Sequence, residues 1–182
     1  MKGRFAVLVA ALAFQRTREL ALSRRLERSR PGQRAAYRSY PLMVAVHMGL
    51  LLLPPLEIRL AHRRPRGAWA WVAVLVAATG LRRWSIQSLG DQWNVHAAVP
   101  DDLRPVVNGP YRWIRHPNYL AVVLEFAALP MAGGAWVSAI ALSALDAAVL
   151  FDRISAEEKL LFRSPAYQEA FASKPRFIPG IF

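Results

Sequence analysis

The sequence alternates between apolar runs and basic or turn-rich segments, and five apolar runs can be distinguished. They cover residues 5–14, 41–56, 68–81, 120–131 and 135–151. A helix of about 20 predominantly apolar residues spans the hydrocarbon core of a bilayer. The first run is shorter than that, but Leu20, Leu22 and Leu26 extend its apolar pattern. We therefore expect a longer first helix, whose flanking arginines snorkel outward to water.

Prolines, glycines and basic residues indicate where these helices end. The pair Pro54-Pro55 closes the second run. After the third run, Arg82, Arg83 and Trp84 are typical of a membrane–water interface. Breaks or turns are expected at 31–32, 85–108 and 130–134.

Composition favours a membrane protein over a soluble one. The 182 residues are 54% hydrophobic and yet carry a net charge of +12, with the charges placed between nearly charge-free apolar blocks. The pattern predicts an all-α integral membrane protein of about five transmembrane helices, divided into residues 1–81 and 82–182. The absence of cysteine excludes a disulfide framework and a thiolate nucleophile. No nucleic-acid-binding motif is present, so no nucleic acid partner is expected.

The basic residues predict an orientation in the membrane. Five spans place alternate connections on opposite sides, and one side then holds eighteen Lys and Arg residues against six on the other. The richer side comprises 15–39, 82–118 and 152–182. Because basic flanks resist translocation, we expect this side and the C-terminus to be cytoplasmic. The connection 57–67, with four arginines, is the exception on the poorer side.

A polar stretch just before the fourth apolar run concentrates candidate chemistry. Residues 107–119 read V-N-G-P-Y-R-W-I-R-H-P-N-Y. Pro117 suits the first position of a helix, where a missing N–H is tolerated. Arg115 and His116 then lie at the mouth of that helix, whose free N–H groups and dipole favour an anion. The sequence predicts a polar pocket there. Alternatively, His116 is a simple interfacial residue, and Tyr111, Trp113 and Tyr119 form an aromatic belt.

The fifth helix is expected to continue as a soluble segment over 152–162 and carries a second candidate group. Arg153 and Glu157 are four residues apart on one helix face, followed by Glu158. This pair could be a surface ion pair, or it could present a cation and a carboxylate to a ligand at the membrane surface.

Ionisable residues within the apolar runs are expected to face the inside of the bundle. Glu125 and Asp146 should contact other helices or a polar cavity, and His47 should hydrogen-bond between helices. No metal site is expected, since His62 and His96 have no partners at ligand spacing.

Together, G-P-Y-R-W-I-R-H-P-N-Y at 109–119 and R-I-S-A-E-E at 153–158 resemble the isoprenylcysteine carboxyl methyltransferase family, integral membrane enzymes that use S-adenosylmethionine. Y-x-x-x-F at 167–171 and R-F-I-P at 176–179 agree with it. The resemblance covers 82–179, which would form the methyltransferase core: cofactor loop, helical hairpin and C-terminal helix. R-R-L-E at 24–27 and S-Y-P-L-M-V at 39–44 resemble a bacterial branch associated with O-methylation of alkylresorcinols and alkylpyrones.

The resemblance implies a role for each matching residue. Tyr111 would contact the adenosine, Arg115 the methionine carboxylate, and Glu157 the ribose or amino group. Arg153 would face the methyl acceptor, and His116 or Glu158 would help a phenolic acceptor to lose its proton. The cofactor would contact Leu103, Arg104, Pro105, Val106, Tyr111, Arg115, His116, Pro117, Asn118, Tyr119 and Glu157.

The family pattern also has departures here, and several acceptors remain open. Arg163-Ser164-Pro165 and Phe171 differ from the usual residues of the C-terminal lid. A phenolic or pyrone lipid or a prenylcysteine carboxylate is the expected acceptor, entering laterally from the bilayer of a bacterial inner membrane. A phospholipid amine N-methyltransferase and a non-catalytic membrane scaffold or transporter are the alternatives.

Overall fold

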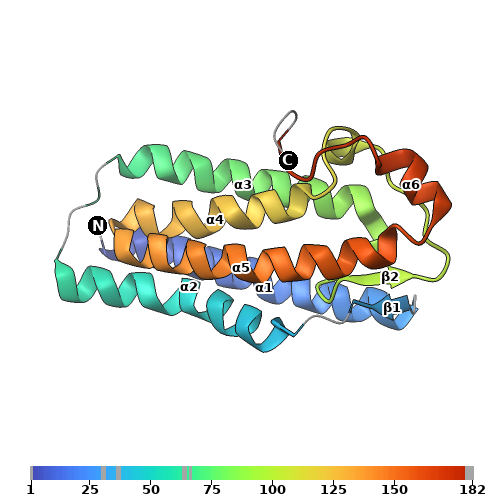
Figure 1. The fold of residues 1–182 in the computed structure, drawn as a ribbon. Coiled ribbons are helices and arrows are strands. Elements are labelled where there is room, and N and C mark those ends of the chain that lie inside the picture. Colours follow the sequence, from blue (N-terminus) through green and yellow to red (C-terminus); the bar gives the residue numbers. More distant parts are fainter. Residues whose placement is uncertain (1, 30–31, 36–37, 63–64, 66, 179–182) are drawn as a thin grey trace.

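Five long helices lie side by side and make up most of the molecule (Figure 1). The structure is a computed structural model and describes residues 2–29, 32–35, 38–62, 65 and 67–178. The long helices are α1 (Lys2–Ser29), α2 (Tyr40–Ala61), α3 (Ala68–Leu89), α4 (Pro117–Gly133) and α5 (Trp136–Leu161). The expected all-α architecture is therefore confirmed for the described residues.

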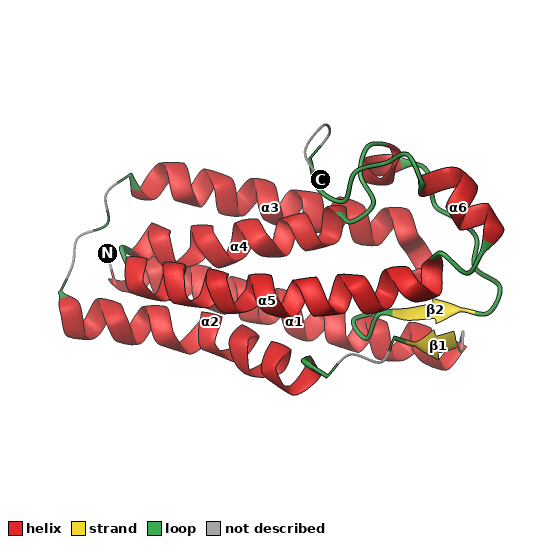
Figure 2. Ribbon diagram, viewed as in Figure 1, coloured by secondary structure: helices red, strands yellow, loops and turns green. Residues whose placement is uncertain are grey.

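The remaining elements gather at one end of the bundle (Figure 2). They are the short helix α6 (Pro165–Phe171), the 3-10 turns η1 (Gly90–Gln92) and η2 (Gly109–Arg112), and the strands β1 (Gly32–Arg34) and β2 (Ala98–Pro100). The strands pair antiparallel, with Gln33 opposite Val99. We call this the strand end, and the opposite end, where α4 turns into α5, the hairpin end.

Several helix boundaries differ from those predicted. The helix α2 does not close at Pro54-Pro55 but continues to Ala61, with Pro54 fully buried. The expected turn-rich stretch begins later, because α3 continues to Leu89. Likewise α4 passes through Pro130 and ends at Gly133. Of the predicted break at 31–32, Pro31 lies outside the described residues, as does Pro179 of R-F-I-P.

Gly133, the last residue of α4, packs closely against two neighbouring helices. A Cβ added at Gly133 would lie 2.3 Å from Cδ1 of Ile58 and 2.7 Å from Cε2 of Phe5. Only glycine therefore lets the ends of α1, α2 and α4 approach this closely. Gly134 follows with φ of 83°, a left-handed conformation that ends the helix and allows α5 to start two residues later.

The apolar side chains divide between a core and an exposed surface. Phe126 and Leu129 of α4 are fully buried, and α4 packs against both α3 and α5. By contrast, large apolar residues on the outer helix faces are exposed: Leu52, Leu60, Val76, Ile140 and Phe151. An apolar surface of this extent is typical of contact with lipid.

Charged residues inside the bundle pair across helices. Glu19 of α1 accepts hydrogen bonds from Nε and Nη2 of Arg82 in α3, the latter at 2.7 Å. Arg16 of α1 pairs with Glu125 of α4, so Glu125 faces inward as expected. Arg82 is only 5% exposed. The prediction that Arg82 lies at the membrane interface is therefore wrong, because Arg82 pairs with a buried carboxylate. The prediction that the arginines after the first run point outward is wrong for Arg16 for the same reason.

Of the other two intramembrane candidates, Asp146 is buried and His47 is partly buried. Asp146 is 1% exposed. The ring of His47 hydrogen-bonds the Met43 carbonyl of its own helix at 2.9 Å and packs edge-on against Phe126. The expected hydrogen bond of His47 between helices is therefore replaced by one within α2.

By length and composition, one helix of the described residues could cross a membrane. This is α2, with a mean hydropathy of 1.6 in its most apolar window. The other long helices either carry the charged residues just described or, like α4 with 17 residues, are short.

Candidate active site

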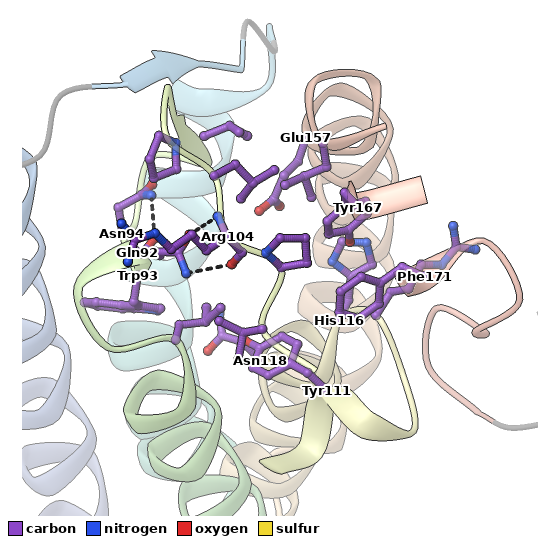
Figure 3. A pocket seen from close by; sticks show the side chains of 18 of the residues that line it. Gln92, Trp93, Asn94, Arg104, Tyr111, His116, Asn118, Glu157, Tyr167 and Phe171 are labelled. Atoms are coloured by element: carbon purple, nitrogen blue, oxygen red, sulfur yellow. Dashed lines mark hydrogen bonds between the residues drawn. The ribbon is translucent and has the colours of Figure 1, made fainter. Parts of the chain in front are cut away.

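A cleft lies at the strand end of the bundle, where α4 begins. It encloses about 760 Å³ of empty space, including its open mouth. Figure 3 shows labelled side chains converging on it from η1, the loop that follows, η2, the start of α4, α5 and α6. The cleft therefore joins segments as far apart in the sequence as Leu89 and Phe171 and depends on the whole strand end.

The structure brings the predicted cofactor residues together. The lining includes Leu103, Arg104, Pro105, Val106, Tyr111, Arg115, His116, Asn118, Tyr119 and Glu157. The remaining residue of that group, Pro117, is buried at the first position of α4. This confirms the local prediction that Pro117 begins the helix. Tyr111 and Tyr119 are each 6% exposed. The Tyr119 hydroxyl has polar partners and Tyr111 lies in an apolar cluster with Tyr167 and Phe171, so the aromatic-belt alternative fits neither, whereas Trp113 is 50% exposed.

Tyr119 joins the two charged residues of α5. Its hydroxyl donates a hydrogen bond to Glu157 Oε2 and accepts one from Arg153 Nε at 2.8 Å. Arg153 also donates from Nη2 to the Val95 carbonyl at 2.6 Å and is 7% exposed. Arg153 and Glu157 therefore meet through a phenol in a buried setting, which excludes the alternative of a solvated surface ion pair.

Glu158 lies among basic side chains. Its carboxylate is 3.0 Å from His116 Nε2, 3.2 Å from Arg115 Nη1 and 2.6 Å from Arg176 Nη2. Burial alone would raise the pKa of Glu158, but the hydrogen bonds from His116 and Arg176 and the nearby positive charges outweigh it and lower the pKa to about 2. An ionised carboxylate of this kind holds its neighbours in place and is a poor acceptor for a substrate proton.

The C-terminal segment closes one side of the cleft. The backbone N–H groups of Arg115 and His116 donate to the carbonyls of Pro175 and Arg176, at 2.9 and 3.0 Å. The rings of Tyr167 and Phe171 stack at 4.5 Å and line the cleft. Burial raises the pKa of the Tyr167 hydroxyl above its ordinary value of 10.0. Tyr167 is thus a neutral wall residue rather than a base.

Two residues that sequence reasoning missed shape the opposite wall. The side-chain amide of Gln92 donates to the Arg104 carbonyl at 2.9 Å and accepts from the Arg104 N–H at 3.0 Å. Asn94 Oδ1 accepts from the N–H groups of His96 and Ala98 at 3.1 and 2.7 Å. Asparagine in a turn-rich stretch is a recognised turn former and could have been found. Nothing in the local sequence signals the pairing of Gln92 with Arg104.

Unpartnered polar atoms test whether the cleft fits the expected cofactor. Among the described residues, Arg115 Nε and Asn118 Oδ1 are buried and lack a hydrogen-bond partner, and both residues line the cleft. Buried polar groups are normally paired. A ligand with anionic and hydrogen-bonding groups would satisfy these two atoms. The cleft also offers the Glu157 carboxylate and buried aromatic rings, a set that fits a molecule with an amino acid moiety, a ribose and a purine.

Comparisons with known proteins identify the family of the chain. The sequence profile of the isoprenylcysteine carboxyl methyltransferase (ICMT) family matches residues 71–163. The chain is also 33% identical over 161 residues to "Uncharacterized protein YpbQ" of Bacillus subtilis (strain 168), covering 86% of this chain and 96% of that relative. The chain therefore belongs to the isoprenylcysteine carboxyl methyltransferase family of membrane methyltransferases.

Proposed function

We propose that the protein is an S-adenosylmethionine-dependent methyltransferase of the bacterial inner membrane that O-methylates a lipid-like acceptor, either a phenolic or pyrone lipid or a prenylcysteine-type carboxylate. The observation that carries this proposal is the Tyr119 hydroxyl, which links Glu157 on the cofactor side with Arg153. Membership of the family supplies the reaction class.

The residues of the cleft have separate tasks in binding the cofactor. Arg115 and the N-terminus of α4 hold its carboxylate, since both are positive. Glu157 accepts hydrogen bonds from its ribose or ammonium group, and Tyr111 packs against the adenosine. When bound, S-adenosylmethionine supplies an electrophilic methyl group on a sulfonium sulfur.

Arg153 orients the acceptor oxygen in line with that methyl group. In such a transfer a C–O bond would form as the C–S bond of the cofactor breaks, and the bonding pair would leave with sulfur as a thioether. A carboxylate acceptor arrives ionised. A phenol, whose ordinary pKa is about 10, loses its proton to water, and the guanidinium of Arg153 stabilises the phenolate. His116 Nε2 lies 3.0 Å from Glu158, which holds the imidazole in one orientation beside the cleft.

The position of Arg153 favours an acceptor with an apolar tail. Its Nη1 contacts the sulfur of Met43 in α2, so the guanidinium lies where α2 meets α5. The neighbouring residues Leu42, Val44 and Phe151 are exposed and apolar. A lipid could keep its tail against these faces in the bilayer while its head reaches Arg153.

Two measurements on the purified protein test the proposal. Calorimetry with S-adenosylhomocysteine should detect binding, and labelled methyl transfer should be seen to an alkylresorcinol or to a prenylcysteine analogue. Transfer to a phenol should accelerate as pH rises towards its pKa, whereas transfer to a carboxylate should change little above neutral pH. Transfer to the amine of phosphatidylethanolamine instead would show that the acceptor atom is nitrogen and not oxygen. Absence of both binding and transfer would refute the function.

Variants of the linked residues separate binding from chemistry. Tyr119→Phe removes the hydroxyl that joins Arg153 and Glu157, and we expect a fall in turnover by about one to two orders of magnitude, because orientation supplies much of the rate. Arg153→Ala should bind S-adenosylhomocysteine nearly normally and yet lose most turnover. Arg153→Lys should recover only part, since an ammonium lacks the planar fork of a guanidinium.

A further inference from the structure

The helix α1 contacts the loop that holds Arg153, although α1 lies outside the part of the chain matched by the family profile. Ser23 of α1 is fully buried. Its hydroxyl accepts a hydrogen bond from the Val95 N–H at 3.0 Å and donates one to Glu27 Oε1 at 2.7 Å. The same peptide segment therefore meets α1 through the N–H of Val95 and α5 through its C=O, to which Arg153 Nη2 donates.

A second contact holds the next residue of the loop. Glu27 Oε1 lies 2.6 Å from His96 Nδ1, so Ser23 and Glu27, one helical turn apart, anchor two consecutive residues. The ring of Tyr40 packs against that of His96, with 5.8 Å between centroids. Asn94 further fixes the loop by accepting the His96 N–H. The peptide of Val95 thus has little freedom to shift.

Arginine is a long side chain whose direction depends on what receives its N–H groups. Arg153 Nε is held by Tyr119, on the cofactor side. Its Nη2 donates to the Val95 carbonyl. The position of that carbonyl depends on the hydrogen bond between the Val95 N–H and Ser23 of α1. A displacement of about 1 Å at a reacting group can lower a rate by about 100-fold. The contacts of α1 therefore bear on the acceptor oxygen that Arg153 orients.

We propose that Ser23 and Glu27 are positioning residues for methyl transfer, which fix the guanidinium of Arg153 through the backbone of Val95. The inference rests on the proposed function, since Arg153 is taken to orient the acceptor. It assigns part of the acceptor site to the N-terminal helix. A purely structural role, in which Ser23 only fastens α1 to the loop, is the competing explanation.

Single variants distinguish the two roles. Ser23→Ala should lower kcat about tenfold, as expected from imprecise orientation, while the Kd for S-adenosylhomocysteine changes less than about twofold. Glu27→Gln keeps a side-chain oxygen that can accept the hydrogen bond of Ser23, so it should lower kcat less than Ser23→Ala does. The matched control is Ser29→Ala, because the Ser29 hydroxyl is exposed and donates to the Leu26 carbonyl of its own helix. It should leave kcat unchanged. A Ser23→Ala protein with lower thermal stability but normal kcat would overturn the proposal.

A double-mutant cycle tests whether Ser23 acts through Arg153. On the Arg153→Ala background, Ser23→Ala should cause no further loss of the residual turnover. The thermal unfolding midpoints of Ser23→Ala, Arg153→Ala and the double variant provide a readout without substrate, and the two losses should be less than additive. Additive losses in both measurements would show that the residues act independently. If the unaltered protein transfers no methyl group, the proposed function fails, and the thermal cycle still decides whether Ser23 and Arg153 are coupled.

Discussion

The Tyr119 hydroxyl has two neighbours with opposite charge, and this explains how a neutral group can lie fully enclosed between them. It donates to the Glu157 carboxylate and accepts from the Arg153 guanidinium. The Arg153 guanidinium also lies 5.2 Å from the centre of the tyrosine ring, a cation–π distance. One side chain of the R-H-P-N-Y motif therefore places the cofactor-side carboxylate and the acceptor-side cation at fixed positions relative to each other.

Gln92 performs a comparable task for the cofactor loop. Its amide satisfies both backbone groups of Arg104, in the manner of a neighbouring strand. The residues 103–106 are expected to contact the cofactor mainly through their backbone. Their conformation therefore depends on a side chain twelve residues earlier.

We predict that Gln92→Ala weakens the binding of S-adenosylhomocysteine by up to about 5- to 150-fold. Two hydrogen bonds, each contributing about 0.5–1.5 kcal/mol, no longer hold the loop in its binding conformation. Calorimetry on the purified protein measures the change. Gln87→Ala, at an exposed position of α3, is the control and should bind normally. Equal affinities for Gln92→Ala and Gln87→Ala would mean that the loop keeps its shape without the amide.

At the scale of elements, the apolar runs predicted the helices well and their ends poorly. The five long helices begin and continue where the sequence indicates. Proline led to wrong ends at 54–55 and 130, because a proline inside a helix removes one hydrogen bond but is tolerated where neighbouring helices pack around it. Packing of this kind is a property of the assembled bundle and leaves no local mark in the sequence.

The same distinction explains which site residues could be predicted. The residues 109–119 form a contiguous motif and were found, as were Arg153 and Glu157 on one helix face. The pairs that complete the site connect distant segments: Gln92 with Arg104 and Ser23 with Val95. Arg16 and Glu125, which pair inside the bundle, are 109 residues apart in the sequence. Only the tertiary structure brings such partners together.

Two basic side chains attach the C-terminal segment to the cleft, in addition to the backbone hydrogen bonds of Pro175 and Arg176. Arg176 Nη2 donates to Glu158 Oε2 at 2.6 Å, and Lys174 Nζ donates to the Tyr111 carbonyl at 2.9 Å. The ion pairs of Glu158, which lies beyond the apolar part of α5, hold this segment against the N-terminus of α4. The strength of these ion pairs should therefore depend on the protonation of the Glu158 carboxylate.

We predict an acid-sensitive contribution of Glu158 to stability. The pKa of Glu158 is about 2 in the folded protein and 4.5 ordinarily. A depressed pKa stabilises the fold fully above about pH 4.5, and this stabilisation is lost as pH falls towards about 2. Glu158→Gln should lower the unfolding midpoint near neutral pH by several degrees, since each kcal/mol shifts Tm by about 2–4 °C at this size.

Thermal scans of the detergent-solubilised protein at decreasing pH check this effect. The difference between unaltered protein and Glu158→Gln should narrow below about pH 4.5, because the Glu158 carboxylate is protonated first in the unfolded chain and only near pH 2 in the folded protein. Glu169→Gln, at an exposed position of α6, should show no such narrowing. If the difference in unfolding midpoint stayed constant down to about pH 3, the charge of Glu158 would not be the cause of its effect on stability.

At the scale of the whole molecule, the candidate site and most of the basic residues share one end. The cleft, α6 and both strands lie at the strand end. The exposed arginines Arg24, Arg25 and Arg28 near the end of α1 lie there as well. The hairpin end contains the start of α5 and the packed Gly133. The proposed use of S-adenosylmethionine would require the strand end to face the cytoplasm, and the charge distribution predicts the same orientation.

The predicted orientation can be tested because the chain contains no cysteine. Ala61→Cys introduces a single exposed thiol at the end of α2, at the hairpin end, and Ser173→Cys one after α6, at the strand end. An impermeant thiol reagent should label Ala61→Cys in intact spheroplasts and Ser173→Cys only after lysis. A cysteine at Gly133 is unsuitable, since its Cβ would collide with Ile58 and Phe5. The opposite labelling pattern would invert the orientation. Labelling of both thiols without lysis would mean that the helices do not separate the two ends across a bilayer.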